Sequence, residues 1–116
     1  MGWGSIEAEP EVTAWLMELD DDDFGQVERY IDLLAAEGVH LGEPFTRHLR
    51  GKLRELRFYL GRSQTRITYF IASGRRIVLL TVFAKHRQRE RREIDRAWRA
   101  MQRCIAEGHM VEEDEK

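Results

Sequence analysis

The apolar residues in the first third of the chain recur every three or four positions, which is the spacing of one face of an α-helix. Trp15 and Leu19 belong to one such stripe, and Pro10 before them fits the first turn of a helix. We therefore predict a short helix over residues 10–19, preceded by a weak strand over residues 3–7.

A second helical stripe runs from Phe24 to Leu34 and predicts a longer helix that ends at Gly38. The run of aspartates at residues 20–23 suits the start of this helix, because a short carboxylate accepts hydrogen bonds from unpaired backbone N–H groups. A calcium loop needs ligands at alternating positions and a glycine, which this run does not offer. A helix cap therefore explains the aspartates better than a metal site.

The period of the apolar residues changes to two in the centre of the chain, after a linking stretch around Gly42, Pro44 and Gly51. Alternation predicts strands over residues 53–60, 65–72 and 77–85. Ser73 and Gly74 form a turn signal between the last two strands. We expect an antiparallel meander, with the last strand in a central position because it is apolar on both faces.

Strand alternation divides the side chains of this sheet between two faces. The face expected to pack on the helices carries Leu56, Phe58, Ile67, Tyr69, Ile71, Val78, Leu80 and Val82. The opposite face carries Glu55, Arg57, Arg66, Thr68, Thr81 and Lys85. The second set predicts an exposed, concave basic surface on rigid strands, where catalytic cations are held well in position.

The last predicted element is a helix over residues 90–107, ended by Gly108. Its apolar stripe consists of Ile94, Ala97, Trp98, Met101 and Ile105. A neighbouring stripe consists of Arg89, Arg92, Arg96, Arg99 and Arg103. Together the elements predict an α+β fold: a small antiparallel sheet with two N-terminal helices packed on one face and a C-terminal helix. Residues 1–108 would form this single domain, and residues 109–116 an acidic flexible tail.

The composition agrees with one globular domain. Of the 116 residues, 42% are hydrophobic and 34% are charged, which is enough for a single core. The only cysteine, Cys104, excludes an internal disulfide and fits a small apolar residue of the last helix. No apolar stretch approaches the ~20 residues of a membrane span, and the N-terminus lacks a signal-peptide pattern, so we expect a soluble, cytoplasmic protein.

The charges are strongly segregated along the chain. Residues 47–103 hold 17 of the 19 lysines and arginines but only four acidic residues, which gives 17 − 4 = +13. The remainder carries 2 − 17 = −15, so the net charge of −2 hides the asymmetry. A surface dense in guanidinium groups attracts phosphate backbones, and we therefore predict contact with nucleic acid.

Four sequence pieces in and around this basic segment carry a resemblance to known proteins. They are Gly51–Arg57 (GKLRELR), Arg66–Phe70 (RITYF), Val78–His86 (VLLTVFAKH) and Glu93–Ala97 (EIDRA). In this order and spacing they resemble the RelE/ParE toxin superfamily, and more closely its HigB-like, phage-derived subfamily. The resemblance implies the toxin of a type II toxin–antitoxin system, which cleaves mRNA in the ribosomal A site.

Such toxins are similar to metal-free ribonucleases, so the resemblance implies no cofactor. The 2′-OH of the RNA attacks the neighbouring phosphate, and the enzyme must supply a base, an acid and charge stabilisation. The implied partners are the ribosome with its mRNA and a cognate antitoxin, often with a helix-turn-helix DNA-binding domain. Toxin and antitoxin would form a hetero-oligomer.

Four residues are candidates for catalysis. Arg57 and Arg66 fit a phosphate clamp, because a guanidinium group can bind two oxygens, and their positions match those that the family uses for substrate phosphate. Lys85 would hold charge, and His86 would act as base or acid, since histidine changes protonation near neutral pH. Close relatives usually have a second lysine at the position of His86, so the acid–base assignment stays open.

Further cations are candidates for contacts with the RNA backbone. They are Lys52, Arg54, Arg87, Arg89, Arg92 and Arg96. The arginines of the last helix have a second interpretation, as a solvated face partly paired with Glu90, Glu93 and Asp95. Their density favours contact with RNA.

Two other functions fit the same fold. A ParE-like toxin would inhibit DNA gyrase without enzymatic activity, although such relatives typically lack clustered cations on the strands. A degraded toxin would retain only the binding of its antitoxin.

Overall fold

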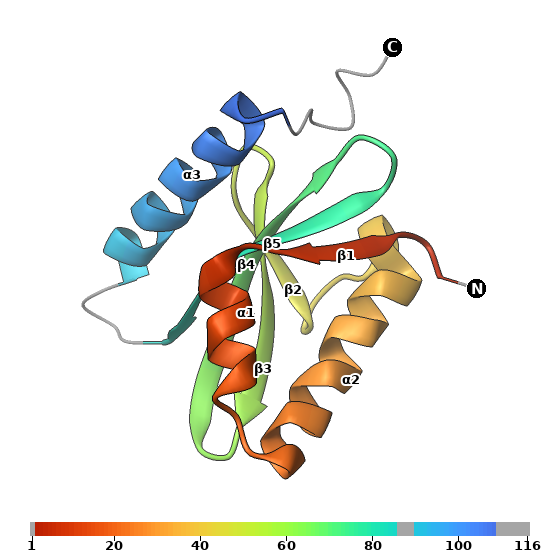
Figure 1. The fold of residues 1–116 in the computed structure, drawn as a ribbon, viewed down its shortest axis with the longest axis vertical. Coiled ribbons are helices and arrows are strands. Elements are labelled where there is room, and N and C mark those ends of the chain that lie inside the picture. The colour runs from red at the N-terminus through yellow and green to blue at the C-terminus, as the bar shows by residue number, and fades with distance from the viewer. Residues whose placement is uncertain (1, 86–89, 109–116) are drawn as a thin grey trace.

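A five-stranded sheet with the strand order β1-β5-β4-β3-β2 separates two layers of helix in the computed structural model, which describes residues 2–85 and 90–108 (Figure 1). The strands are β1 (Ser5–Ala8), β2 (Thr46–Arg50), β3 (Leu53–Leu60), β4 (Ser63–Ala72) and β5 (Arg76–Ala84). The helices are α1 (Pro10–Met17), α2 (Asp21–Glu37), the 3₁₀ turn η1 (Gly38–His40) and α3 (Glu90–Ala106). The α+β prediction is confirmed. The predicted tail, residues 109–116, lies outside the described residues.

The sheet is mostly antiparallel. β3, β4 and β5 form the predicted meander, and β1 adds to β5 in parallel. β2, which pairs antiparallel with β3, lies in the stretch that we interpreted as a linker, so that interpretation was wrong. β2 is an edge strand, and Thr46 is its only buried residue. Its other side chains need not be apolar, so the sequence of β2 has no apolar alternation that would predict a strand.

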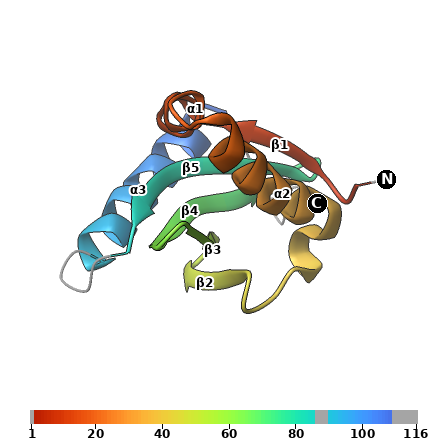
Figure 2. The ribbon, with the colours of Figure 1, turned by 90° about the horizontal axis from the view of Figure 1, so that it is seen from below.

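Helices α1 and α2 pack on one face of the sheet, opposite α3 (Figure 2). Val12 of α1 and Val27 and Leu34 of α2 are fully buried against the apolar side chains of β3, β4 and β5. The predicted cap of α2 is present, since Asp20 Oδ1 accepts a 2.8 Å hydrogen bond from the backbone N–H of Asp23. This face of the sheet therefore follows the sequence prediction for both N-terminal helices.

Helix α3 covers part of the other face, and this arrangement corrects two predicted side-chain positions. Val78 and Leu80 were expected to face α1 and α2, but they pack with Met101 of α3. The cause is a β-bulge: Thr68 pairs with Thr81 while Tyr69 pairs with Leu79, so Leu80 is an extra residue in β5. One extra residue reverses the alternation of a strand, so the residues before the bulge exchange faces.

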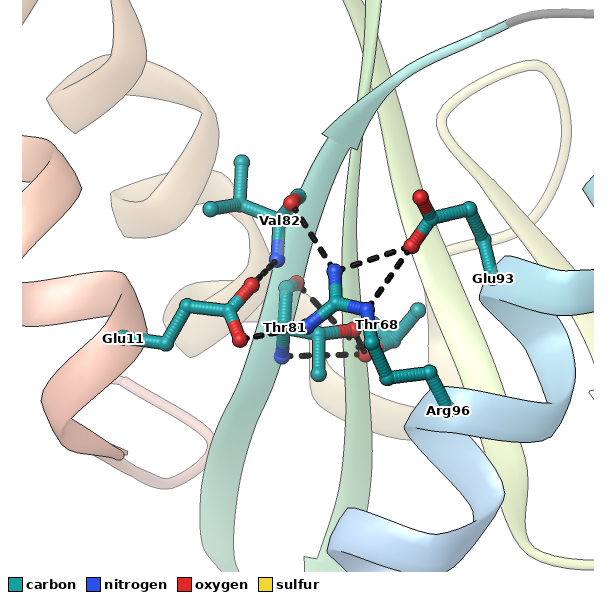
Figure 3. A network of polar contacts seen from close by, with 6 residues as sticks. All are labelled: Glu11, Thr68, Thr81, Val82, Glu93 and Arg96. Carbon is teal, nitrogen blue, oxygen red and sulfur yellow. Dashed lines mark hydrogen bonds and ion pairs between the residues drawn. The ribbon is translucent and has the colours of Figure 1, made fainter. Parts of the chain in front are cut away.

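A polar network beside the bulge connects α1, β5 and α3 (Figure 3). One carboxylate oxygen of Glu11 accepts a 3.0 Å hydrogen bond from the N–H of Val82, and the other accepts from Arg96. Arg96 also donates to Glu93 at 3.0 Å and to the Val82 carbonyl oxygen at 3.4 Å. The network fixes the N-terminal half of α3 against the sheet.

Among the described helices, none has both the length and the apolar character needed to cross a membrane.

Candidate functional site

A cleft of about 500 Å³ opens where β3 ends, β4 begins and β5 ends. Its cations are Arg57, Arg66 and Lys85, and the other lining residues are Tyr30, Pro44, Phe45, Phe58, Tyr59 and Gln64. Three of the four residues predicted for catalysis are thus neighbours in space. The fourth, His86, lies outside the described residues.

The register of the sheet explains why these cations meet. Arg57 of β3 lies directly opposite Arg66 of β4, so both side chains leave the same face of the sheet. The backbone N–H of Lys85 donates a 2.8 Å hydrogen bond to the carbonyl oxygen of Gln64, which holds the end of β5 beside the start of β4. The three cations therefore depend on the pairing of three strands, and their positions are set by the backbone.

Glu55 is an acidic residue in contact with both arginines of this site, and only 1% of it is exposed. Its Oε2 lies 3.5 Å from Arg66 Nε and 3.6 Å from Arg57 Nε. Both distances exceed those of a normal hydrogen bond. Within residues 2–85 and 90–108, the two carboxylate oxygens and both Nε atoms have no hydrogen-bond partner. The carboxylate therefore balances charge without engaging the arginines in close hydrogen bonds.

The burial of this face corrects the prediction of an exposed basic surface. Glu55, Arg66, Thr68 and Thr81 are all buried. Helix α3 packs on the same face, and Phe83 lies beside Arg66 in the register of β4 and β5. Arg57 is partly buried, and Lys85 is exposed at the strand end. The basic surface is consequently a cleft at one end of the sheet and not an open face.

Burial sets the electrostatics of the pair formed by Glu55 and Arg66. Desolvation raises the pKa of Glu55 above its ordinary value, although Arg66 and Arg57 lower it in part. Desolvation likewise lowers the pKa of Arg66, opposed by Glu55. A raised carboxylate pKa beside a lowered guanidinium pKa is typical of functional sites, where charge is held out of water.

Two polar residues of the cleft were missed by the sequence analysis. Gln64 Nε2 donates a 2.9 Å hydrogen bond to the hydroxyl of Tyr59, and Gln64 Oε1 accepts from Arg66 Nη2 at 3.4 Å. Strand alternation could have indicated Tyr59, because it lies two positions after Arg57 and faces the same side. Gln64 lies opposite Tyr59 in the pairing of β3 with β4, but the predicted strand began only at residue 65, so Gln64 was not assigned to it.

The residues predicted to bind RNA along its backbone are spread over the molecule. Lys52 is exposed in the turn between β2 and β3, and Arg92 is exposed on α3. Arg54 is partly buried and donates a 3.3 Å hydrogen bond to Thr46 Oγ1, while Arg96 belongs to the network with Glu11 and Glu93. Arg54 and Arg96 therefore have partners within the protein. Arg87 and Arg89 lie outside the described residues.

A second basic groove, of about 380 Å³, lies between β2 and the start of α3. It is lined by Arg47, His48, Leu49, Arg50, Glu90, Arg91 and Ile94. Arg50 forms a 2.8 Å ion pair with Asp95, so part of this charge is neutralised. The groove lies beside β2, the strand that the sequence analysis missed.

The mostly antiparallel sheet between helical layers, with a cationic cleft at its strand ends, is consistent with the small RelE-like class of α+β proteins. The chain belongs to the family described as phage-derived protein Gp49-like (DUF891), which matches residues 14–102. This family is part of the RelE-like toxin superfamily and indicates a toxin-like protein. The matched segment includes every residue that lines the cleft. No curated protein matches the chain.

Proposed function

We propose that this protein is the toxin of a type II toxin–antitoxin system, HigB-like in type, and that it cleaves mRNA on the ribosome. The observation that carries the proposal is the convergence of Arg57, Arg66 and Lys85 on one cleft. Two guanidinium groups and an ammonium group around one space suit a phosphodiester whose negative charge increases during cleavage. Membership of a toxin superfamily supports the same function.

In the proposed reaction the 2′-OH of the RNA loses its proton and its oxygen bonds to the adjacent phosphorus. The bond from phosphorus to the 5′-oxygen then breaks, and that oxygen takes up a proton. Arg57 and Arg66 would bind the non-bridging oxygens with their terminal nitrogens, while Lys85 would stabilise the developing charge. His86 is the sequence-based candidate for one of the two proton transfers.

Some exposed cations outside the cleft suit contacts that do not depend on base sequence. Lys52, Arg91 and Arg92 are exposed on the turn after β2 and on the first half of α3. Phosphate contacts of this kind position a protein on a nucleic acid, and they weaken as the salt concentration rises. In the proposed function they would bind ribosomal RNA, and a cognate antitoxin would block the cleft.

A translation extract with primer-extension mapping of RNA ends tests the proposal. Wild-type protein should create new mRNA ends, and Arg57→Ala combined with Arg66→Ala should abolish them. Arg29→Ala, an exposed arginine of α2 outside the basic segment, is the matched control and should cleave normally. Thermal melting establishes that the double variant is folded.

Three results would contradict the proposed function. Cleavage that persists in the folded double variant would remove both arginines from the mechanism. Inhibition of DNA gyrase in a supercoiling assay, with no RNA cleavage by wild-type protein, would instead support a ParE-like toxin. Neither cleavage nor growth arrest, with antitoxin binding retained, would indicate an inactive toxin.

A further inference from the structure

One wall of the cleft is aromatic. Tyr30 and Phe58 stack with ring centroids 5.0 Å apart and planes 14° from parallel, and Phe58 is only 5% exposed. Tyr59 and Phe45 are different, because 58% of Tyr59 and 36% of Phe45 are exposed. Both rings therefore expose part of their surface in the cleft, where a ligand can contact them.

The exposed rings and the cations share the same cleft. Arg57 and Arg66 reach it from β3 and β4, Lys85 follows β5, and Tyr59 lies two residues after Arg57. A nucleotide combines an anionic phosphate with a flat, largely apolar base, and a base stacks well on an aromatic side chain. The volume of about 500 Å³ falls within the roughly 300–1,000 Å³ typical of small-ligand sites.

We infer that the cleft is a subsite for one unpaired RNA nucleotide, which stacks its base on Tyr59 and Phe45 while its phosphate is bound by Arg57, Arg66 and Lys85. This inference deepens the proposed function, on which it rests, by assigning the substrate base a position. It also predicts that the base is extruded from any stack of its neighbours, because the rings must contact its face.

Gln64 connects the two halves of this subsite. Its amide nitrogen donates to the Tyr59 hydroxyl, and its amide oxygen accepts from Arg66. One side chain therefore contacts both the guanidinium that we propose binds the phosphate and the ring that we propose stacks on the base. Such a connection is expected where base and phosphate of a single nucleotide bind together.

The charge of the cleft favours RNA over a protein segment as the occupant of the aromatic wall. The centre of a protein–protein interface is usually depleted of charged residues. Here three cations lie among the aromatic side chains. A second exposed aromatic residue, Phe24 of α2, does not line this cleft, so it provides a control for the loss of an exposed ring.

The test is the binding of a short single-stranded RNA with 2′-O-methyl riboses, measured by fluorescence anisotropy on the full chain. This RNA cannot be cleaved through its 2′-oxygen, so binding is measured apart from catalysis. Tyr59→Ala should weaken binding about 5- to 100-fold, as expected for the loss of one stacked base. Phe24→Ala, the control, should bind within about twofold of wild type, and Tyr59→Phe, which keeps the ring but loses the hydroxyl that Gln64 contacts, should weaken binding less than Tyr59→Ala does.

An abasic scan identifies stacking as the cause. Removing the base at the bound position should weaken wild-type binding to the level of Tyr59→Ala, and should leave Tyr59→Ala itself unchanged. Wild-type affinity in folded Tyr59→Ala would overturn the inference. Equal losses from the abasic change in both proteins would overturn it too.

Two further outcomes keep this inference distinct from the proposed function. If Tyr59→Ala binds RNA normally but loses its antitoxin, the aromatic wall is a protein-docking surface and the inference is wrong. If wild-type protein binds the RNA through Tyr59 but cleaves no mRNA in the translation extract, the proposed enzymatic function fails while the nucleotide subsite stands.

Discussion

Glu55 Oε2 and Arg66 Nε lie 3.5 Å apart, and both side chains are at least 96% buried. Arg57 Nε approaches the same oxygen to 3.6 Å. Two arginines directly opposite on neighbouring strands repel each other, and a carboxylate between them reduces that repulsion. Because the carboxylate faces the Nε atoms, the terminal nitrogens of the arginines can be directed to a phosphate. Glu55 is thus a candidate positioning residue.

Replacing Glu55 with glutamine should separate catalysis from binding. The cleavage rate at saturating RNA should fall at least about tenfold, because the two guanidinium groups lose the charge that holds them together. The affinity for RNA should stay constant or increase, since the cleft becomes more positive by one charge. A merely structural role for Glu55 would reduce the amount of active protein and leave the rate and affinity of the folded fraction unchanged. Glu28→Gln, at an exposed position of α2, is the matched control.

The stability of the protein should depend on pH through Glu55. Burial raises the pKa of Glu55 above its ordinary value of 4.5 in spite of Arg66, Arg57 and Arg47, and Glu90 raises it further. The folded protein therefore holds this proton more tightly than the unfolded chain does. The contribution of Glu55 to stability is fully present below the ordinary pKa and is lost as pH rises through the raised pKa.

Urea unfolding of wild type and Glu55→Gln over a pH series measures this contribution. The free energy of unfolding of wild type minus that of the variant should decrease as pH rises above 4.5. Glutamine does not titrate, so the stability of the variant should change less than that of wild type over this pH range. A difference that increases with pH would show that the carboxylate is stabilised in the folded state, contrary to this account.

The contact of Arg96 with Glu11 should contribute to stability by joining α3 to α1. Arg96→Met and Glu11→Gln should each lower the free energy of unfolding by about 1 kcal/mol, a modest value because both side chains are more than a third exposed. A double-mutant cycle should reveal coupling between them. Arg92→Met, exposed on the same helix, is the control and should change stability little. Strictly additive effects of the two changes would contradict the coupling.

Gly38 at the end of α2 should not tolerate a side chain. Its φ is +53°, and an added Cβ would lie 2.1 Å from the ring of Trp3. Gly38→Ala should therefore lower the free energy of unfolding by about 2–4 kcal/mol. Gly61, in the turn between β3 and β4, has a similar φ of +62° but open space around it, so Gly61→Ala should cost about 1 kcal/mol. Equal losses in thermal or urea unfolding would show that contact with Trp3 has no effect.

The parts of the fold with a strong period were predictable from the sequence. The strand Leu53–Leu60 has the predicted bounds, and α2 begins after Asp20 and ends at Gly38 as expected. β2 could not be recognised, because an edge strand with one buried residue carries no alternating pattern. The bulge at Leu80 could not be predicted either, because β5 is apolar on both faces. The sequence therefore does not show which of its side chains face α1 and α2 and which face α3.

The candidate site likewise has a part that the sequence predicts and a part that it does not. The convergence of Arg57 and Arg66 follows from strand alternation and a simple hairpin register. The burial of Glu55 does not, because it depends on α3 packing over a face that the sequence analysis treated as exposed. Charged residues on a strand usually indicate a face exposed to solvent. Only the tertiary arrangement shows that the Glu55 carboxylate is buried beside its two arginines.

The most direct test of the central claim is the single-turnover rate of mRNA cleavage at saturating ribosome complex, measured for Lys85→Ala and Arg57→Ala. If the cations of the cleft stabilise the charge of the transition state, each variant should cleave about 10²–10³ times more slowly than wild type, as for the loss of one stabilising group in other enzymes. Arg29→Ala should cleave at the wild-type rate. Wild-type rates in folded Lys85→Ala and Arg57→Ala would contradict the account.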